Sequence, residues 1–245
     1  MNILVVGASG ATGRLLVEQL LNRGHFVKVI VRSPERLPAA WRHHERLSTI
    51  QASVLDLSDA ELAEHVRGCD AVASCLGHNL TFKGVYGHPR RLVTDTVRRL
   101  SQAIKANRPA KPTKFVLMNT VGNRNRDLHE PIPFAQHLVI GLLRLLPPHV
   151  DNEQAADYLR TQIGRHDELI EWAAVRPDGL TNEEAVTAYD IFPSPIVSAI
   201  FGSGQTSRIN VGHFMAELIS NDECWQQWKG QMPVIYNRSF SSQVQ

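Results

Sequence analysis

The chain reads Gly7-Ala8-Ser9-Gly10-Ala11-Thr12-Gly13 immediately after an apolar run, Ile3-Leu4-Val5-Val6, and immediately before Arg14-Leu15-Leu16-Val17-Glu18-Gln19-Leu20. This pattern predicts a short buried strand that turns through glycines into a helix. Such a turn aims free backbone N–H groups and the positive end of the helix dipole at one point, where a diphosphate group can bind. A glycine-rich turn without a ligand is the alternative, and the strand-to-helix context argues against it.

Each glycine of the turn is expected to have its own steric role. Gly7 allows the tight turn, Gly10 lets a phosphate approach the backbone, and Gly13 lets the helix pack close to its strand. We therefore expect a dinucleotide to contact this turn, which contributes the cofactor-binding candidates Gly7, Ser9, Gly10, Ala11, Thr12 and Gly13.

The rest of the chain continues the alternation of strands and helices. Strands are expected at residues 2–7, 25–32, 47–52, 70–76, 113–120, 170–175 and 232–236, and helices at 12–23, 58–67, 89–107, 133–146, 151–163 and 210–220. Strands joined by helical crossovers are parallel. The sequence thus predicts the α/β class, with a doubly wound, mostly parallel sheet ordered 3-2-1-4-5-6 plus an edge strand. Short strands are expected near 185–189 and 206–209, and Pro147-Pro148 is expected to end the helix 133–146.

Length and composition limit the function classes. The 245 residues fit a single domain over 1–245, with 121–150 and 178–209 as insertions on the substrate side. A net charge of +2 argues for neither nucleic acid nor an acidic membrane as a partner. Three cysteines without CxxC spacing, and no visible signal peptide, favour a cytoplasmic protein. The apolar stretch 134–146 is too short to cross a bilayer and is a candidate homodimer interface.

Ligands of such a sheet bind outside the carboxyl ends of the strands, and the second strand ends on Arg32-Ser33. An NAD-selective protein has an acid here, about twenty residues past the last glycine, for the ribose 2′-hydroxyl. A guanidinium suits a 2′-phosphate instead, and Ser33 adds a hydroxyl donor. A charge-assisted bond of about 1.5–3 kcal/mol favours NADP over NAD by about tenfold or more. A surface arginine that merely ends a strand is the alternative.

The next strand ends supply further candidates. Asp56 is expected to accept a hydrogen bond from the adenine amino group while Leu57 packs on the ring, although an acid that simply precedes a helix is equally expected there. Leu76-Gly77 is expected to let the cofactor pass close to the backbone. In the loop beyond, His78 and Tyr86 are candidate proton donors, and each is otherwise an ordinary loop residue.

The central strands end beside the expected nicotinamide position. Asn119 and Thr120 can hydrogen-bond the ribose or a substrate carbonyl, and the turn at Pro177 is expected to contact the carboxamide end of the cofactor. Arg176 has a structural alternative, paired within the sheet layer. The histidines are scattered, and the sequence has no HExxH motif or cysteine cluster, so we expect no metal site. It also has no G-x-S-x-G turn, so we expect no serine hydrolase.

The chain resembles the atypical short-chain dehydrogenases/reductases, in their NmrA-like and NAD(P)H-binding branch. The resemblance runs from residue 1 to about 236 and rests on Gly7 to Gly13, Val31-Arg32-Ser33, Asp56-Leu57, Leu76-Gly77, Val121-Gly122, Val175-Arg176-Pro177 and Trp228-Lys229. It implies that the protein binds NADP and reduces a small hydrophobic carbonyl, enone or quinone-like substrate.

One departure from this group concerns its Tyr-x-x-x-Lys pair. Tyr86, Tyr158 and Tyr189 are followed four residues on by Arg90, Gln162 and Pro193. Without the lysine no tyrosine is expected to titrate near neutral pH, since a phenol ordinarily titrates near 10. Water, Thr120, His78 or Tyr86 would then supply the proton.

The lysine's place is taken by Asn152 or Glu153, which can accept hydrogen bonds from the ribose hydroxyls. Their alternative role is the first turn of a helix capped by Asp151. The missing pair leaves an alternative function, an NADP-sensing regulatory protein without turnover. An epimerase or isomerase fits less well, because such enzymes of nucleotide sugars also use the pair.

Overall fold

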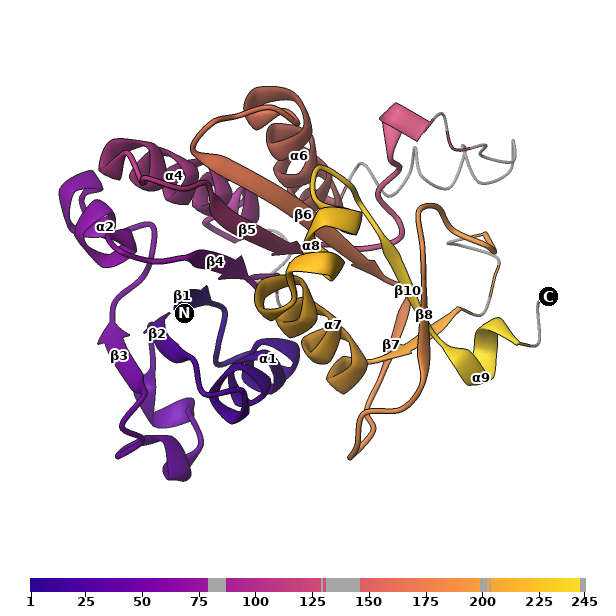
Figure 1. The fold of residues 1–245 in the computed structure, drawn as a ribbon, viewed down its shortest axis with the longest axis horizontal. Coiled ribbons are helices and arrows are strands. Elements are labelled where there is room, and N and C mark those ends of the chain that lie inside the picture. The colour runs from indigo at the N-terminus through magenta and orange to yellow at the C-terminus, as the bar shows by residue number, and fades with distance from the viewer. Residues whose placement is uncertain (79–86, 129, 131–145, 199–201, 203, 243–245) are drawn as a thin grey trace.

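The computed structural model describes residues 1–78, 87–128, 130, 146–198, 202 and 204–242, and within them one sheet runs in the order β3-β2-β1-β4-β5-β6-β10-β8 (Figure 1). Its strands are β1 (Asn2–Val6), β2 (Phe26–Val31), β3 (Leu47–Gln51), β4 (Ala71–Ser74), β5 (Thr113–Met118), β6 (Ile170–Pro177), β8 (Tyr189–Phe192) and β10 (Val234–Asn237). All neighbours are parallel except β10 and β8. The predicted α/β class and the order 3-2-1-4-5-6 are confirmed.

Strand β1 is an unbroken apolar run because both of its faces are buried. Successive side chains of a strand point to opposite faces of the sheet. Ile3 and Val5 accordingly pack in one core cluster, and Leu4 and Val6 in the other. Because helices cover both faces, every position of the strand interior must be apolar.

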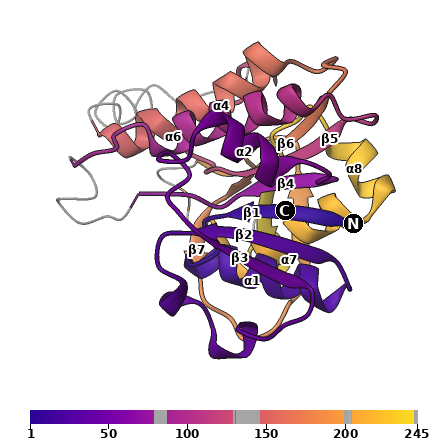
Figure 2. The same cartoon turned by 90° about the vertical axis from the view of Figure 1, so that its left-hand side faces the viewer.

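Helices form a layer on each side of the sheet (Figure 2). One layer contains α1 (Ala11–Asn22), α7 (Arg208–Ser220) and α8 (Asp222–Trp228), and the other contains α2 (Asp59–Val66), α4 (Leu92–Asn107) and α6 (Pro147–Tyr158). A capping box starts α2: Ser58 Oγ accepts a hydrogen bond from Glu61 N (3.2 Å), and Glu61 Oε2 accepts one from Ser58 N (2.7 Å).

The start of α6 corrects one prediction, the role of Asp151. Pro147 and Pro148 occupy the first turn of this helix, where a missing N–H costs no hydrogen bond. Asp151 therefore does not cap α6; it lies within it, with its side chain only 1% exposed. The expected apolar helix 133–146 falls almost wholly outside the described residues, as does all but Leu146 of the candidate dimer interface 134–146.

Smaller elements follow β6 and connect the larger ones. A two-stranded parallel sheet joins β7 (Gly179–Thr181), which was not predicted, to β9 (Gln205–Ser207), and the strand expected near 185–189 is β8. The rest are the 3₁₀ helices η1 (Pro34–Arg36), η2 (Ala39–Trp41) and η3 (Arg126–Leu128), the π-helical turn η4 (Leu159–Ile163) and the short helix α9 (Arg238–Ser241). Among the described residues, no helix is both long enough and apolar enough to cross a bilayer.

Candidate functional site

The turn between β1 and α1 is held by two close backbone contacts. Gly7 has φ +82°, and a Cβ there would lie 2.5 Å from the carbonyl carbon and oxygen of Cys75. A Cβ on Gly13 would overlap the carbonyl oxygen of Gly7. The expected steric roles of these two glycines, a tight turn and close packing of helix on strand, are confirmed.

The amino terminus of α1 forms a site for an anion. Gly10 precedes the helix and has no side chain to cap it. Gly10 N donates to Gly7 O (3.0 Å) and Arg14 N donates to Gly10 O (3.0 Å). The N–H groups between them, those of Ala11, Thr12 and Gly13, have no acceptor among the described residues. Unpaired N–H groups and the positive end of the helix dipole together suit a phosphate.

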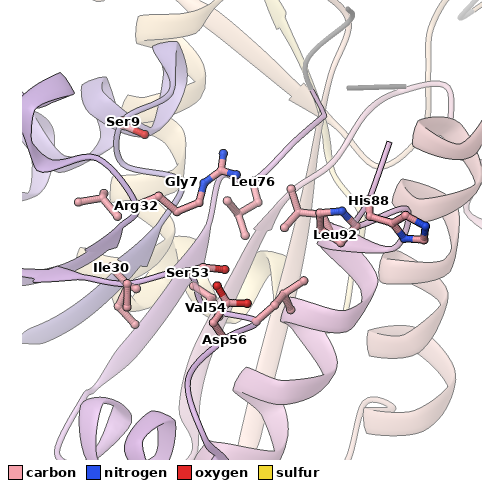
Figure 3. Close-up of a pocket in the computed structure, with 14 residues that line it drawn as sticks. Gly7, Ser9, Ile30, Arg32, Ser53, Val54, Asp56, Leu76, His88 and Leu92 are labelled. Carbon is pink, nitrogen blue, oxygen red and sulfur yellow. The ribbon is translucent and has the colours of Figure 1, made fainter. Parts of the chain in front are cut away.

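A cavity of ≈ 380 Å³ lies beside this turn, over the carboxyl ends of β1, β2, β3 and β4 (Figure 3). It is lined by Gly7, Ser9, Ile30, Val31, Arg32, Ala52, Ser53, Val54, Leu55, Asp56, Leu76, His88, Pro89 and Leu92. Five of the predicted cofactor-binding residues are therefore brought together: Gly7, Ser9, Arg32, Asp56 and Leu76.

Arg32 is exposed at one side of this cavity, with Ser53 and Asp56 on a second side and His88 and Leu92 on a third (Figure 3). None of the described carboxylates forms an ion pair with its guanidinium, which is thus available to a ligand. Ser33 does not line the cavity; its carbonyl accepts a hydrogen bond from Arg36 N (3.1 Å) in the next turn.

The loop after β3 differs from the prediction in its apolar contacts. Leu57 packs against the core under α2 and α4, while Ala52, Val54 and Leu55 line the cavity beside Asp56. Arg99 of α4 holds this loop in place: its Nη1 donates to Val54 O and Leu55 O (2.9 Å each), and its Nη2 donates to Leu57 O. Nothing near Arg99 in the sequence indicates this role, because it depends on how α4 packs.

His78 is turned into the protein. Its Nε2 lies 2.7 Å from Asp151 Oδ2, and its side chain is only 5% exposed. The same Asp151 carboxylate accepts hydrogen bonds from the backbone N–H groups of Val93 and Thr94 (2.8 Å each), at the start of α4. Asp151 thus caps a neighbouring helix and joins three segments. The other candidate proton donor of this loop, Tyr86, lies outside the described residues.

Asn119 and Thr120 follow β5 as predicted, but the amide of Asn119 is already engaged. Its Nδ2 donates to Asn152 O (2.9 Å), and its Oδ1 accepts from Thr120 N (2.8 Å) and from Asn123 Nδ2. Among the described residues, the hydroxyl oxygen of Thr120 accepts one long hydrogen bond, from Gly122 N (3.3 Å). Of these two residues, Thr120 has the freer side chain.

The remaining candidates have the following positions. Glu153 Oε1 lies 2.9 Å from Arg126 Nη2, so this carboxylate faces the loop after β5. At Gly77 an added Cβ would meet nothing within 4 Å, which leaves its backbone open to close approach. Pro177 is buried at the end of β6, and its carbonyl accepts a hydrogen bond from Val121 N (3.1 Å).

Two charged residues at the end of β6 have contrasting surroundings. Arg176 is fully buried and structural, with Nη2 2.7 Å from Glu130 Oε1 and Nη1 3.0 Å from Glu130 Oε2. Asp178 has no ion-pair partner in the described part of the chain: its Oδ1 accepts a hydrogen bond from Gly179 N (2.8 Å), and burial raises the pKa of its carboxyl to about 6. Sequence reasoning missed Asp178, because burial of a turn residue cannot be recognised from its neighbours in the chain.

An uncapped helix that faces a cavity over the carboxyl ends of parallel strands is typical of dinucleotide-binding proteins. The chain belongs to the NAD(P)H-binding family, whose sequence model matches residues 7–222. Its cofactor class is therefore a nicotinamide dinucleotide, and the resemblance to NAD(P)-binding short-chain dehydrogenases/reductases is confirmed.

Individual relatives are distant or match over a short stretch. An uncharacterized chloroplast protein of Arabidopsis thaliana is 41% identical over 71 residues, which make up 29% of this chain and 25% of that protein. The 3 beta-hydroxysteroid dehydrogenase/Delta 5→4-isomerase of Mycobacterium tuberculosis is 39% identical over 71 residues, 29% of this chain and 17% of that enzyme. The matched stretch thus spans a quarter or less of either relative.

A solved structure matches over nearly the whole chain. The short-chain dehydrogenase/reductase of Veillonella parvula, crystallised in complex with NADP, has a TM-score of 0.69 at 18% identity and covers 98% of this chain and 95% of its own. At this identity the match establishes the shared fold.

Proposed function

We propose that this protein binds NADP(H) and reduces small hydrophobic carbonyl, enone or quinone-like substrates. The observation that carries the proposal is Arg32, a guanidinium at the rim of the cavity without a described ion-pair partner. An NAD-selective protein has an acid at this position, and a guanidinium there suits a 2′-phosphate. The complex of the Veillonella parvula protein with NADP supports the preference for NADP. The partial match to a dehydrogenase of Mycobacterium tuberculosis supports oxidoreductase chemistry.

In this proposal, different residues of the site contact different parts of the cofactor. The N–H groups of Ala11, Thr12 and Gly13 donate to the diphosphate, and Arg32 donates to the 2′-phosphate. Asp56 lies where it can accept a hydrogen bond from the adenine amino group. When bound, NADPH supplies a hydride for reduction of the substrate.

Calorimetric titration of the Arg32→Ala variant tests the cofactor assignment. Loss of one charge-assisted contact should weaken NADP binding by about tenfold or more and leave NAD binding nearly unchanged. Arg36→Ala is the matched control, because Arg36 is also exposed nearby but does not line the cavity. An equal loss for NADP and NAD in Arg32→Ala would refute the 2′-phosphate role.

A second function, NADP sensing without turnover, is favoured by one observation. His78 and Asn119, two groups expected to take part in the reaction, are both engaged by other parts of the protein. Single-turnover oxidation of bound NADPH by a panel of aldehydes, quinones and enones separates the two functions. Oxidation by at least one class supports the reductase, whereas tight binding with no oxidation by any of them supports the sensor.

A further inference from the structure

The loop between β3 and α2 forms one wall of the cofactor cavity. Residues 52–56 all line the cavity, and Figure 3 shows Ser53, Val54 and Asp56 together on one side of it. Asp56 is exposed there, and its carboxylate forms no ion pair or hydrogen bond with the side chains and backbone of the described residues. This carboxylate is therefore an acceptor available to a ligand of the cavity.

Three carbonyl groups of the same loop depend on Arg99 of α4. No backbone N–H group of the described residues donates to Val54 O, Leu55 O or Leu57 O. Arg99 Nη1 donates to Val54 O and Leu55 O (2.9 Å each), while Nη2 donates to Leu57 O and, at 2.9 Å, to Asp59 Oδ1. The four acceptors match the four hydrogens that the two Nη atoms carry. Because carbonyl groups removed from water need donors, the guanidinium stabilises this conformation of the loop.

Arg99 itself does not line the cavity. Its side chain is only 16% exposed, and α4 is held against α2 further along by Asn107, whose Nδ2 donates to Ala63 O (2.7 Å). The position of the guanidinium is thus set by the packing of two helices. Any effect of Arg99 on a bound ligand must act through the loop that it holds.

We propose that Arg99 is a positioning residue for recognition of the adenine base. Leu55 and Leu57, whose carbonyls it holds, flank Asp56, so the guanidinium fixes the backbone from which the Asp56 carboxylate reaches the cavity. The carboxylate then accepts a hydrogen bond from the adenine amino group. The proposal rests on the proposed binding of NADP and adds the residue that gives the site its preference for adenine over a purine without this amino group.

Hypoxanthine is the purine that reveals this preference, because a carbonyl oxygen replaces the amino group of adenine. That oxygen cannot donate to the Asp56 carboxylate, and two acceptors would then face one another. A lost hydrogen bond to a charged group corresponds to about a tenfold loss of affinity or more. A carboxylate on a loop that is free to move discriminates less, because ordering the loop opposes the gain from the hydrogen bond.

The test compares the binding of NADP with that of its hypoxanthine analogue by calorimetric titration. The wild type should bind NADP about tenfold more tightly or better. Arg99→Lys keeps the charge but cannot hold three carbonyls at once, and should reduce this preference to about twofold. Arg98→Lys is the matched control, because Arg98 is the neighbouring arginine of α4 and pairs with Asp95 (3.3 Å); it should keep the wild-type preference.

The readout separates positioning from a merely structural role. The ratio of two affinities measured on one sample does not depend on the fraction of protein that is folded. Asp56→Ala should abolish the preference, and adding Arg99→Lys to it should change the ratio no further, since both act on one contact. Arg99→Gln, whose amide holds fewer carbonyls, should show the same loss of preference and replaces Arg99→Lys if that variant does not fold.

Hydrogen exchange gives a measurement without cofactor. The amide of Asp56, which donates to Ser53 O (3.0 Å), should exchange faster in Arg99→Lys than in Arg98→Lys. A wild-type preference retained in Arg99→Lys overturns the positioning role alone. A wild type that binds both dinucleotides equally overturns adenine recognition by Asp56 and Arg99, and one that binds neither overturns the proposed cofactor as well.

Discussion

Gly13 and Gly77 flank the same cofactor site but differ in what a side chain would meet. A Cβ on Gly13 would overlap the carbonyl oxygen of Gly7, whereas one on Gly77 would meet nothing within 4 Å. Gly13→Ala should therefore lower the free energy of unfolding by about 1–3 kcal/mol, the usual cost of overpacking. Gly77→Ala is the matched control and should stay within about 0.5 kcal/mol of the wild type. Urea denaturation measures both, and equal stability of the two variants would contradict the role of Gly13.

At the level of single residues, the sequence predicts what the local backbone requires and misses what distant segments contribute. The steric roles of Gly7 and Gly13 follow from a motif in which all the partners are neighbours in the chain. The burial of His78 against Asp151 depends on a contact between residues 73 positions apart. The elevated pKa of Asp178 likewise depends on burial, to which the distant residue Gly204 contributes by packing against the carboxyl group.

Among the elements, α4 owes its start to a residue of another helix. Asp151→Ala would leave the N–H groups of Val93 and Thr94 and the ring of His78 without their partner. We expect the free energy of unfolding to fall by about 2–4 kcal/mol, more than the ~1 kcal/mol expected for Ser58→Ala, which removes an ordinary cap from α2. Hydrogen exchange locates the effect: the amides of Val93 and Thr94 should exchange faster in Asp151→Ala only. Unchanged exchange at these amides would contradict this account.

Helix boundaries were predictable where the chain carries its own cap. Ser58 and Glu61 form a capping box at the predicted start of the helix 58–67, and both partners belong to one turn. The sequence did not reveal that Pro147 and Pro148 begin a helix, since proline is compatible with either boundary of a helix. The strand β7 was missed because it follows β6 after a single residue, so that no loop separates the two strands.

The stability of the whole molecule should depend on pH through Asp178. Its pKa is about 6 in the folded protein and 3.8 in the unfolded chain, so between these values the folded state binds more protons. Stability attributable to this group is therefore highest near pH 4, falls as pH rises toward 6, and stays low above it. After discounting for solvent, we expect a loss of about 1–2 kcal/mol, absent in Asp178→Asn. Urea midpoints at pH 4.5 and 7.5 check this, and parallel shifts in both proteins would contradict it.

The order of the sheet was predictable because each parallel crossover has one favoured hand and the inner strands, such as β1 and β4, are separate apolar runs. The antiparallel strand β8 adds a neighbour to β10 that was not expected there. Its four residues, Tyr189–Phe192, are all partly exposed and mix polar with apolar side chains, so they lack the continuous hydrophobicity of the inner strands.

The isolation of Arg32 has an evolutionary consequence. Gly7 and Gly13 are fixed by contacts that the fold cannot give up, whereas Arg32 contributes no ion pair to the described interior. Its replacement by an acid should leave the architecture intact and reverse which coenzyme is preferred. If Arg32 has the proposed role, coenzyme choice therefore depends on one position, and a single substitution there leaves the turn that presents the diphosphate unchanged.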